Sequence, residues 1–221
     1  MIIITQVVFL FSCSERYFYQ KHLKDNYGDY HSKISYLSDK IAINQNDAEA
    51  YLERGRLYIG IGHYSKGIED LDNAIIIKPD FGEAYLLRGY SKYNYFNYKK
   101  EMLDQAYDDA NKMIELKYKI CKAYLLRGRV QSFRNNYSDA IKDMDKAIEA
   151  DINCGWAYYV RGQIKHDQYD DYNGSLSDLK KAKTIFNEEG DKLGYDLTKD
   201  LIKFIKQRRL EDKLFKFLFG I

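Results

Sequence analysis

The stretch AYLLRG occurs at residues 84–89 and again at residues 123–128. Two variants, AYLERG at 50–55 and AYYVRG at 157–162, complete a series of four. The arginines of the series stand at spacings of 34, 39 and 34 residues and are Arg54, Arg88, Arg127 and Arg161. A period in this range indicates supersecondary units that stack on one another.

Each unit has the pattern of a helix pair. Its apolar residues recur at three- and four-residue steps, which predicts two helices separated by a turn. In the first unit we expect helices over 48–61 and 64–77, with Gly62 in the turn and Pro79 after the second helix. Five extra residues around 99–105 explain the spacing of 39, and the fourth unit has one extra residue near Asp170.

The first unit, AEAYLERGRLYIGIGHYSKGIEDLDNAIIIKPD, resembles the tetratricopeptide repeat. The residues that carry the resemblance are Tyr51, Gly55, Tyr58, Tyr64, Ala74 and Pro79. The later units lack the terminal proline, and Met113 replaces the small residue in the second unit. The resemblance covers 48–187 and implies an all-α, right-handed superhelical solenoid of antiparallel helix pairs.

We therefore expect four repeats, approximately over 48–81, 82–120, 121–154 and 155–188. A further repeat is expected before them, over 14–47. It is degenerate because a terminal repeat has a neighbour on one face only. Residues 189–221 are expected to form a capping helix, with Leu197, Leu201, Phe204 and Ile205 as its buried stripe, followed by a basic and apolar tail.

Each arginine of the series is matched by an aspartate in the following helix. The pairs are Arg54 with Asp70, Arg88 with Asp109, Arg127 with Asp143, and Arg161 with Asp178. We predict that each pair forms a partly buried salt bridge within its repeat. The alternative is solvated charges that coincide through shared ancestry. The glycine after each arginine costs about 1 kcal/mol in a helix relative to alanine. Because glycine recurs despite this cost, we expect the second helix to approach too closely for a side chain.

The resemblance also implies a concave groove, lined mainly by the first helices, in which a peptide or partner helix binds. The residues that map to this face are Glu49, Leu52, Arg56, Ile59, Glu83, Leu86, Tyr90, Tyr93, Lys122, Leu125, Arg129, Phe133, Trp156, Tyr159, Gln163 and His166. Aromatic and arginine side chains suit protein recognition. The alternative is that several of these aromatic residues pack between repeats.

Other classes of function have no support in the sequence. The net charge is +2 without a basic cluster, so we expect no nucleic-acid partner. Phosphate-loop, zinc-protease and serine-hydrolase motifs are absent, so we expect no enzyme, no catalytic residue, no metal and no cofactor. Cys121 and Cys154 are expected to be small apolar fillers, although an oxidising compartment would permit a bridge between them.

The N-terminal stretch MIIITQVVFLFSC resembles a bacterial lipoprotein signal over residues 1–13. The resemblance implies that Cys13 is lipidated and that the protein is anchored in the bacterial envelope, as a scaffold or assembly factor for a membrane complex. The alternative is a cytoplasmic protein whose N-terminal segment packs on the first helix pair. In either case the main prediction is a protein–protein interaction module, whose oligomeric state stays open.

The C-terminal stretch RRLEDKLFKFLFGI alternates basic and apolar residues. Its apolar positions Leu210, Leu214, Phe217 and Leu218 share one helix face, and Arg208, Arg209, Lys213 and Lys216 surround it. We expect this segment to cover the end of the solenoid. The alternatives are contact with an anionic membrane surface and dimerisation.

Overall fold

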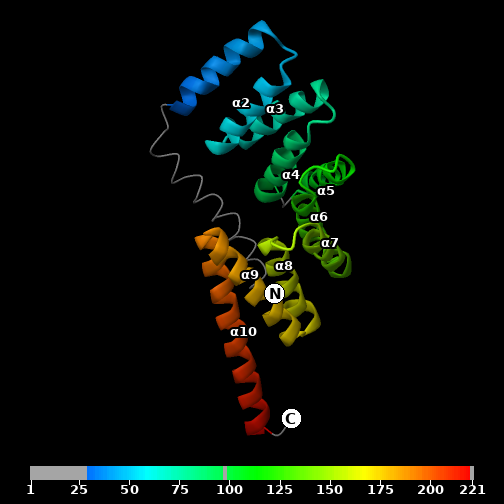
Figure 1. The fold of residues 1–221 in the computed structure, drawn as a ribbon, viewed down its shortest axis with the longest axis vertical. Helices are drawn as coiled ribbons and strands as arrows, with labels where there is room; N and C mark the ends of the chain where they lie inside the picture. The colour runs from blue at the N-terminus through cyan, green and yellow to red at the C-terminus, as the bar shows by residue number, and fades with distance from the viewer. Residues whose placement is uncertain (1–28, 97–98, 220–221) are drawn as a thin grey trace. The chain divides into compact units, whose positions relative to one another are not determined.

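The computed structural model describes residues 29–96 and 99–219 (Figure 1). Every regular element in these ranges is a helix, which confirms the predicted all-α class. After a helix over 29–43, the elements are α2 (Ala48–Gly60), α3 (Tyr64–Ile77), α4 (Gly82–Phe96), α5 (Lys100–Glu115), α6 (Ile120–Phe133), α7 (Tyr137–Ala150), α8 (Gly155–Tyr169), α9 (Tyr172–Glu189) and α10 (Lys192–Phe219). Among the helices in the described ranges, none is both long and apolar enough to cross a membrane.

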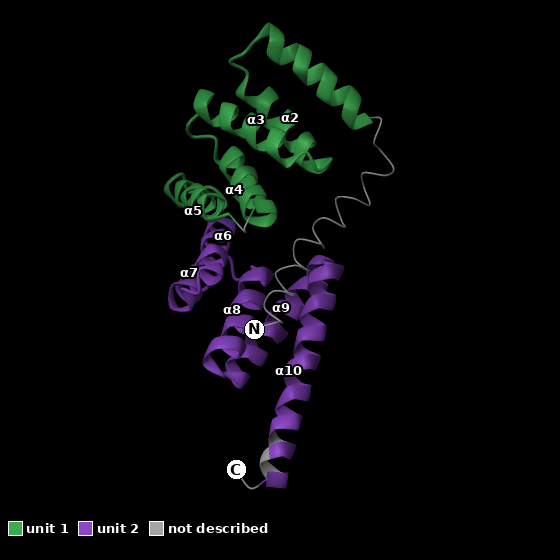
Figure 2. Ribbon diagram, turned by 180° about the vertical axis from the view of Figure 1, so that it is seen from behind, with its two compact units in different colours: residues 1–119 green, residues 120–221 purple. Residues whose placement is uncertain are grey.

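The chain divides into two compact units, residues 1–119 and residues 120–221 (Figure 2). In the first unit, α2 packs on α3 and α4 packs on α5; in the second unit, α6 packs on α7 and α8 packs on α9. The first pair spans 48–60 and 64–77, so the predicted helices are correct except that α2 ends one residue early. Each pair is therefore one helix–turn–helix repeat.

Helix ends follow from local sequence. The Asp47 side chain caps α2 by accepting a hydrogen bond of 2.9 Å from the backbone N–H of Ala50. Asp171 caps α9 in the same way through the N–H of Gly174. Gly190 ends α9 with φ of 71°, a left-handed conformation that glycine adopts without steric cost.

Glycines of the repeated Arg-Gly pair lie where two helices of a repeat approach closely. A Cβ added to Gly55 would lie 2.9 Å from the carbonyl oxygen of Gly67 in α3. One added to Gly162 would lie 3.0 Å from Cγ of Leu179 and 3.1 Å from the carbonyl oxygen of Ser175, both in α9. These contacts explain why the helices keep glycine despite its low propensity.

The core lies between the helices of each unit. Leu52, Leu71, Ala74 and Ala84 form one cluster in the first unit, drawn from α2, α3 and α4. The predicted small-residue positions of the four repeats are all fully buried, including the departure Met113; they are Ala74, Met113, Ala147 and Ala182. A methionine fits here because its flexible side chain fills irregular gaps.

The five inserted residues of the second repeat lengthen its helices. Relative to α2 in the arginine frame, α4 continues two residues further. Relative to α3 in the aspartate frame, α5 begins three residues earlier. These two and three residues together equal the length of the insertion.

Each arginine of the series donates two hydrogen bonds to its matched aspartate. The Nε to Oδ2 and Nη2 to Oδ1 distances are 2.9 and 2.7 Å for Arg54 with Asp70. They are 2.9 and 2.6 Å for Arg127 with Asp143, and the pairs in α4–α5 and α8–α9 have the same bidentate arrangement. The aspartates are buried and the arginine side chains are 17–19% exposed.

A second partner, which the sequence analysis missed, joins some of these arginines to the preceding repeat. Nη1 of Arg88 lies 2.7 Å from Asp72 in α3, and Nη1 of Arg161 contacts Asp145 in α7. Nη1 of Arg54 lies 3.1 Å from Oγ of Ser38 in the helix over 29–43. Each second partner stands 16 residues before its arginine, so this constant offset was the available signal. Ser38 thus stands to Arg54 as Asp72 stands to Arg88 and Asp145 to Arg161.

The electrostatics of the Arg88 pair show how the charges persist in the core. Burial opposes the charge of Arg88, but the carboxylates of Asp109 and Asp72 outweigh that effect, so the pKa of Arg88 lies above its ordinary value. Lys92 is 4% exposed and 3.9 Å from Asp109. Burial lowers the pKa of Lys92, although Asp109 opposes this.

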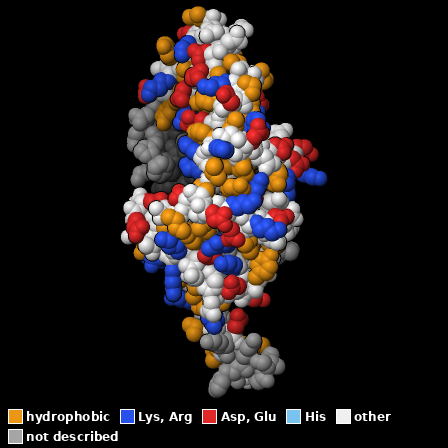
Figure 3. Space-filling view, turned by 45° about the vertical axis from the view of Figure 1, so that its right-hand side comes forward, with side chains coloured by type: hydrophobic (Ala, Val, Ile, Leu, Met, Phe, Trp, Pro, Cys, Tyr) orange, Lys and Arg blue, Asp and Glu red, His pale blue; other side chains and the backbone are white. Residues whose placement is uncertain are grey.

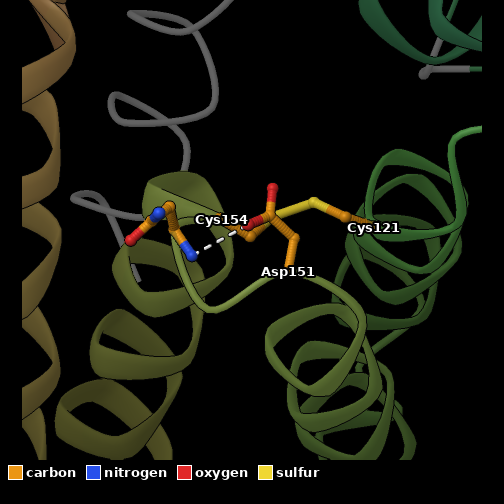
Figure 4. The surroundings of a disulfide bond; sticks show 4 residues. Cys121, Asp151 and Cys154 are labelled. Atoms are coloured by element: carbon orange, nitrogen blue, oxygen red, sulfur yellow. Dashed lines mark hydrogen bonds between the residues drawn. A yellow bond between two sulfur atoms is a disulfide. The ribbon is translucent and has the colours of Figure 1, made fainter.

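A disulfide joins Cys121 in α6 to Cys154, the residue before α8 (Figure 4). The prediction that these cysteines are fillers is therefore wrong, and the bridge that the sequence analysis left as an alternative is present. Because the two residues are separated by 33 positions, the bond links the starts of the first helices of two consecutive repeats within the second unit.

The C-terminal helix α10 has two different halves. In its first half Thr198 is fully buried. Of the predicted buried stripe, Ile205 is fully buried, whereas Leu197, Leu201 and Phe204 are half-buried. In its second half Leu210, Leu214, Phe215, Leu218 and Phe219 are 53–68% exposed, and α10 runs past α8 and α9 (Figure 1). The prediction that the tail covers the end of the solenoid is therefore wrong for these residues.

Candidate protein-binding surface

In the first unit, charged residues of the predicted groove pair with one another or with neighbouring helices. Nη2 of Arg56 in α2 lies 2.8 Å from Oε1 of Glu83 in α4, which connects the first helices of two repeats. Glu49 is exposed and pairs with Lys78 at 3.1 Å. Tyr90 and Tyr93 on α4 are half-buried. This part of the predicted groove, the row of residues on the first helices, is thus polar and partly accessible.

Five residues of the predicted groove are buried, and their placement on an open surface is corrected. Leu52, Leu86, Leu125, Arg129 and Tyr159 are 2–8% exposed. Leu52 belongs to the cluster that includes Ala84 of the next first helix, and Ile59 packs against the same cluster. The apolar side chains at these positions fill the space between successive helices, because packing in a repeat protein is between neighbours.

In the second unit, aromatic residues of α8 form a connected group. The Trp156 ring lies 5.6 Å from that of Tyr159 and 4.7 Å from that of Phe186 in α9. The guanidinium of Arg129 in α6 lies 5.7 Å from the Trp156 ring centroid, a cation–π distance. Burial raises the pKa of Tyr159 above its ordinary value, although Arg129 opposes this, so the hydroxyl stays neutral at physiological pH.

The remaining residues of the row keep accessible surface. Phe133 is 40% exposed and Lys122 is exposed at the start of α6. Trp156, Gln163 and His166 on α8 are half-buried. Nδ1 of His166 lies 2.8 Å from Asp167, and its ring contacts that of Phe204 in α10. These side chains offer a polar and aromatic surface.

The surface electrostatics are mixed. On the face shown in Figure 3, acidic and basic side chains alternate with apolar ones, and neither sign gathers into a single large patch. Over the described ranges, no group of three or more His, Cys, Asp or Glu side chains could hold a metal ion. Cys13, the predicted lipidation site, lies outside the described residues.

Comparisons with known proteins find similarity in structure. No protein-family model matches the sequence, and no curated protein matches it. Among solved structures, MamA is 22% identical over 76% of this chain and 95% of its own, with a TM-score of 0.64. PilW, a type IV pilus biogenesis factor, is 14% identical over 87% of this chain and 92% of its own, with a TM-score of 0.62.

A third similar structure is YrrB, a tetratricopeptide repeat protein with an unusual peptide-binding site. It is 17% identical over 81% of this chain and 88% of its own, with a TM-score of 0.59. The repeat period, the paired helices and these structural matches agree, so the chain has the tetratricopeptide repeat fold.

Proposed function

We propose that this chain is a protein-binding module whose first helices take an extended peptide or a partner helix. The observation that carries the proposal is the row of accessible aromatic and polar side chains on these helices, after the buried leucines are set aside. In the second unit the row contains Phe133, Trp156, Gln163 and His166. Trp and other aromatic residues dominate binding energy in protein interfaces.

Two further points support this function. Trp156 packs against the buried Arg129 and against Phe186, so its ring belongs to a preformed surface. A preformed surface loses less conformational entropy on binding than a flexible one. YrrB, which has a similar fold, has a peptide-binding site.

The test uses Trp156, the only tryptophan of the chain, as an internal reporter. Peptides are selected from a random library against the full chain and then titrated while the Trp156 emission is recorded. We expect saturable spectral shifts, which the double substitution Phe133→Ala and His166→Ala weakens by at least tenfold. The matched control is Ile76→Ala on the second helix α3, where the side chain is 76% exposed. Selected peptides that bind without changing Trp156 emission, or that bind both variants equally, would refute the proposal.

A second candidate is an envelope-anchored scaffold held by a lipidated Cys13. The observation that favours it is the Cys121–Cys154 disulfide, because disulfides persist in oxidising compartments and are rare in the cytosol. Intact mass spectrometry of protein from its own source tests it. A chain that begins at Cys13, carries acyl groups and retains the disulfide would support the anchored form. An unmodified chain from Met1 with free thiols would exclude it.

A further inference from the structure

The second half of α10 is a helix without a core to pack against in the second unit. Beyond Ile205, every residue of α10 whose side chain is described is exposed or half-buried. The helix nevertheless continues to Phe219 (Figure 1). Most helical stability in proteins comes from packing of an apolar face. We therefore expect this segment to pack against a surface outside the second unit.

The exposed apolar side chains of this segment form two stripes on one side of the helix. At 100° per residue, Leu210, Leu214 and Leu218 follow one another in the first stripe, and Phe215 and Phe219, whose rings are 4.5 Å apart, form the second. The two stripes together span about half of the circumference, and the exposed Glu211 lies between them. A two-stranded coiled-coil seam is narrower, with two apolar positions in about seven. The arc that contains the two stripes is therefore wider than such a seam.

The charges of the segment are of one predominant sign. From Lys206 to Phe219 the sequence has five Lys or Arg and two Asp or Glu. Lys206 and Arg208 are exposed. Arg209 instead lies 3.8 Å from the Tyr172 ring centroid and anchors the helix to α9. This excess of cations repels a second copy of the same segment and attracts an anionic surface.

We propose that the second half of α10 docks on an anionic lipid surface. Leu210, Leu214, Leu218 and the two phenylalanines enter the boundary between head groups and acyl chains. Lys206 and Arg208 contact the anionic head groups. This activity is separate from peptide binding by the first helices and does not depend on it.

The test is co-sedimentation of the full chain with vesicles. Vesicles of phosphatidylglycerol mixed with phosphatidylcholine are expected to bind the protein, and vesicles of phosphatidylcholine alone are not. Binding weakens as salt is raised, because salt screens the head-group charges. Lys206→Gln with Arg208→Gln lowers the partition coefficient by about 30-fold, since each basic residue near the surface contributes about fivefold.

Two matched controls separate this site from general effects. Lys180→Gln with Lys181→Gln removes the same charge from exposed positions of α9 and is expected to have little effect. Leu214→Gln with Phe215→Gln is expected to abolish binding, whereas Ile152→Gln, at a side chain 60% exposed, leaves it intact. None of the substituted side chains is buried, so we expect each variant to fold. Circular dichroism checks this.

Three results would overturn the proposal. The first is no binding to anionic vesicles. The second is equal binding by the α10 variants and the parent chain, which would place lipid contact elsewhere. The third is a dimer in light scattering that Leu214→Gln with Phe215→Gln dissociates, which would make a second copy the occupant. Peptide titrations followed by Trp156 emission stay unchanged in the α10 variants, so failure of this proposal is distinguishable from failure of the peptide-binding function.

Discussion

The Arg127–Asp143 pair allows the clearest test of what holds two helices of a repeat together. Asp143 is 5% exposed and accepts hydrogen bonds of 2.9 and 2.6 Å from Arg127. In two of the three equivalent pairs, Lys92 or Lys165 also lies within 4.0 Å of the aspartate. No such lysine pairs with Asp143 in the described residues, so substitution of Arg127 leaves this carboxylate with little compensation.

The expected free energies follow from burial. Arg127→Met leaves a buried carboxylate without its cation and destabilises by about 3–5 kcal/mol. Asp143→Leu costs less, about 1–3 kcal/mol, because the Arg127 side chain is 19% exposed and keeps some hydration. The double variant replaces both charges by apolar groups, so its loss falls short of the sum by a coupling energy of about 2–3 kcal/mol.

The assay is urea unfolding of the four proteins of the double-mutant cycle. Far-UV circular dichroism reports the helices and Trp156 fluorescence reports the second unit, and coincident transitions justify a two-state free energy. The control cycle uses Lys142 and Asp139 on α7, which pair at 2.9 Å but are 66% and 55% exposed; its coupling is expected to be about 0.3–0.5 kcal/mol. If Arg127 and Asp143 gave a coupling as small as the control, the reasoning from burial would be refuted.

Two further predictions concern the disulfide and the first helix cap. Reduction of the Cys121–Cys154 bond, which closes a loop of separation 33, is expected to lower the free energy of unfolding by about 3–4 kcal/mol on the chain-entropy estimate; an unchanged urea midpoint with reductant would contradict this. The hydrogen bond from Lys40 and that from the N–H of Ala50 hold the pKa of Asp47 below its usual value. The charge of Asp47 therefore stabilises the fold at pH values above the pKa of this residue in the unfolded chain. This contribution disappears as pH falls through its pKa in the folded protein. Asp47→Asn keeps the cap and removes the charge, so unfolding curves of the two proteins should differ by about 0.3–1 kcal/mol at neutral pH and converge in acid; a constant difference at all pH values would argue against the charge effect.

The sequence by itself determined the repeat and its helix pairs. These depend on local periodicity: apolar steps of three and four residues, a turn glycine and a recurrent arginine each leave a mark along the chain. The Arg–Asp spacing shifted by the length of each insertion, so the pairing could be predicted before any coordinates. The constant offset of 16 residues to Ser38, Asp72 and Asp145 was present as well and was missed.

Only the tertiary structure decided which first-helix residues are accessible. Leu52 and Arg129 occupy helix positions that the repeat pattern assigns to the groove, yet contacts with Ala84 and Trp156 of the following first helices accompany their burial. The disulfide likewise depends on how closely α6 and the start of α8 approach. The exposure of Leu214 depends on where α9 begins, because Arg209 already lies beside Tyr172, the first residue of α9. Burial and proximity result from neighbours distant in sequence, and no pattern within a single helix encodes them.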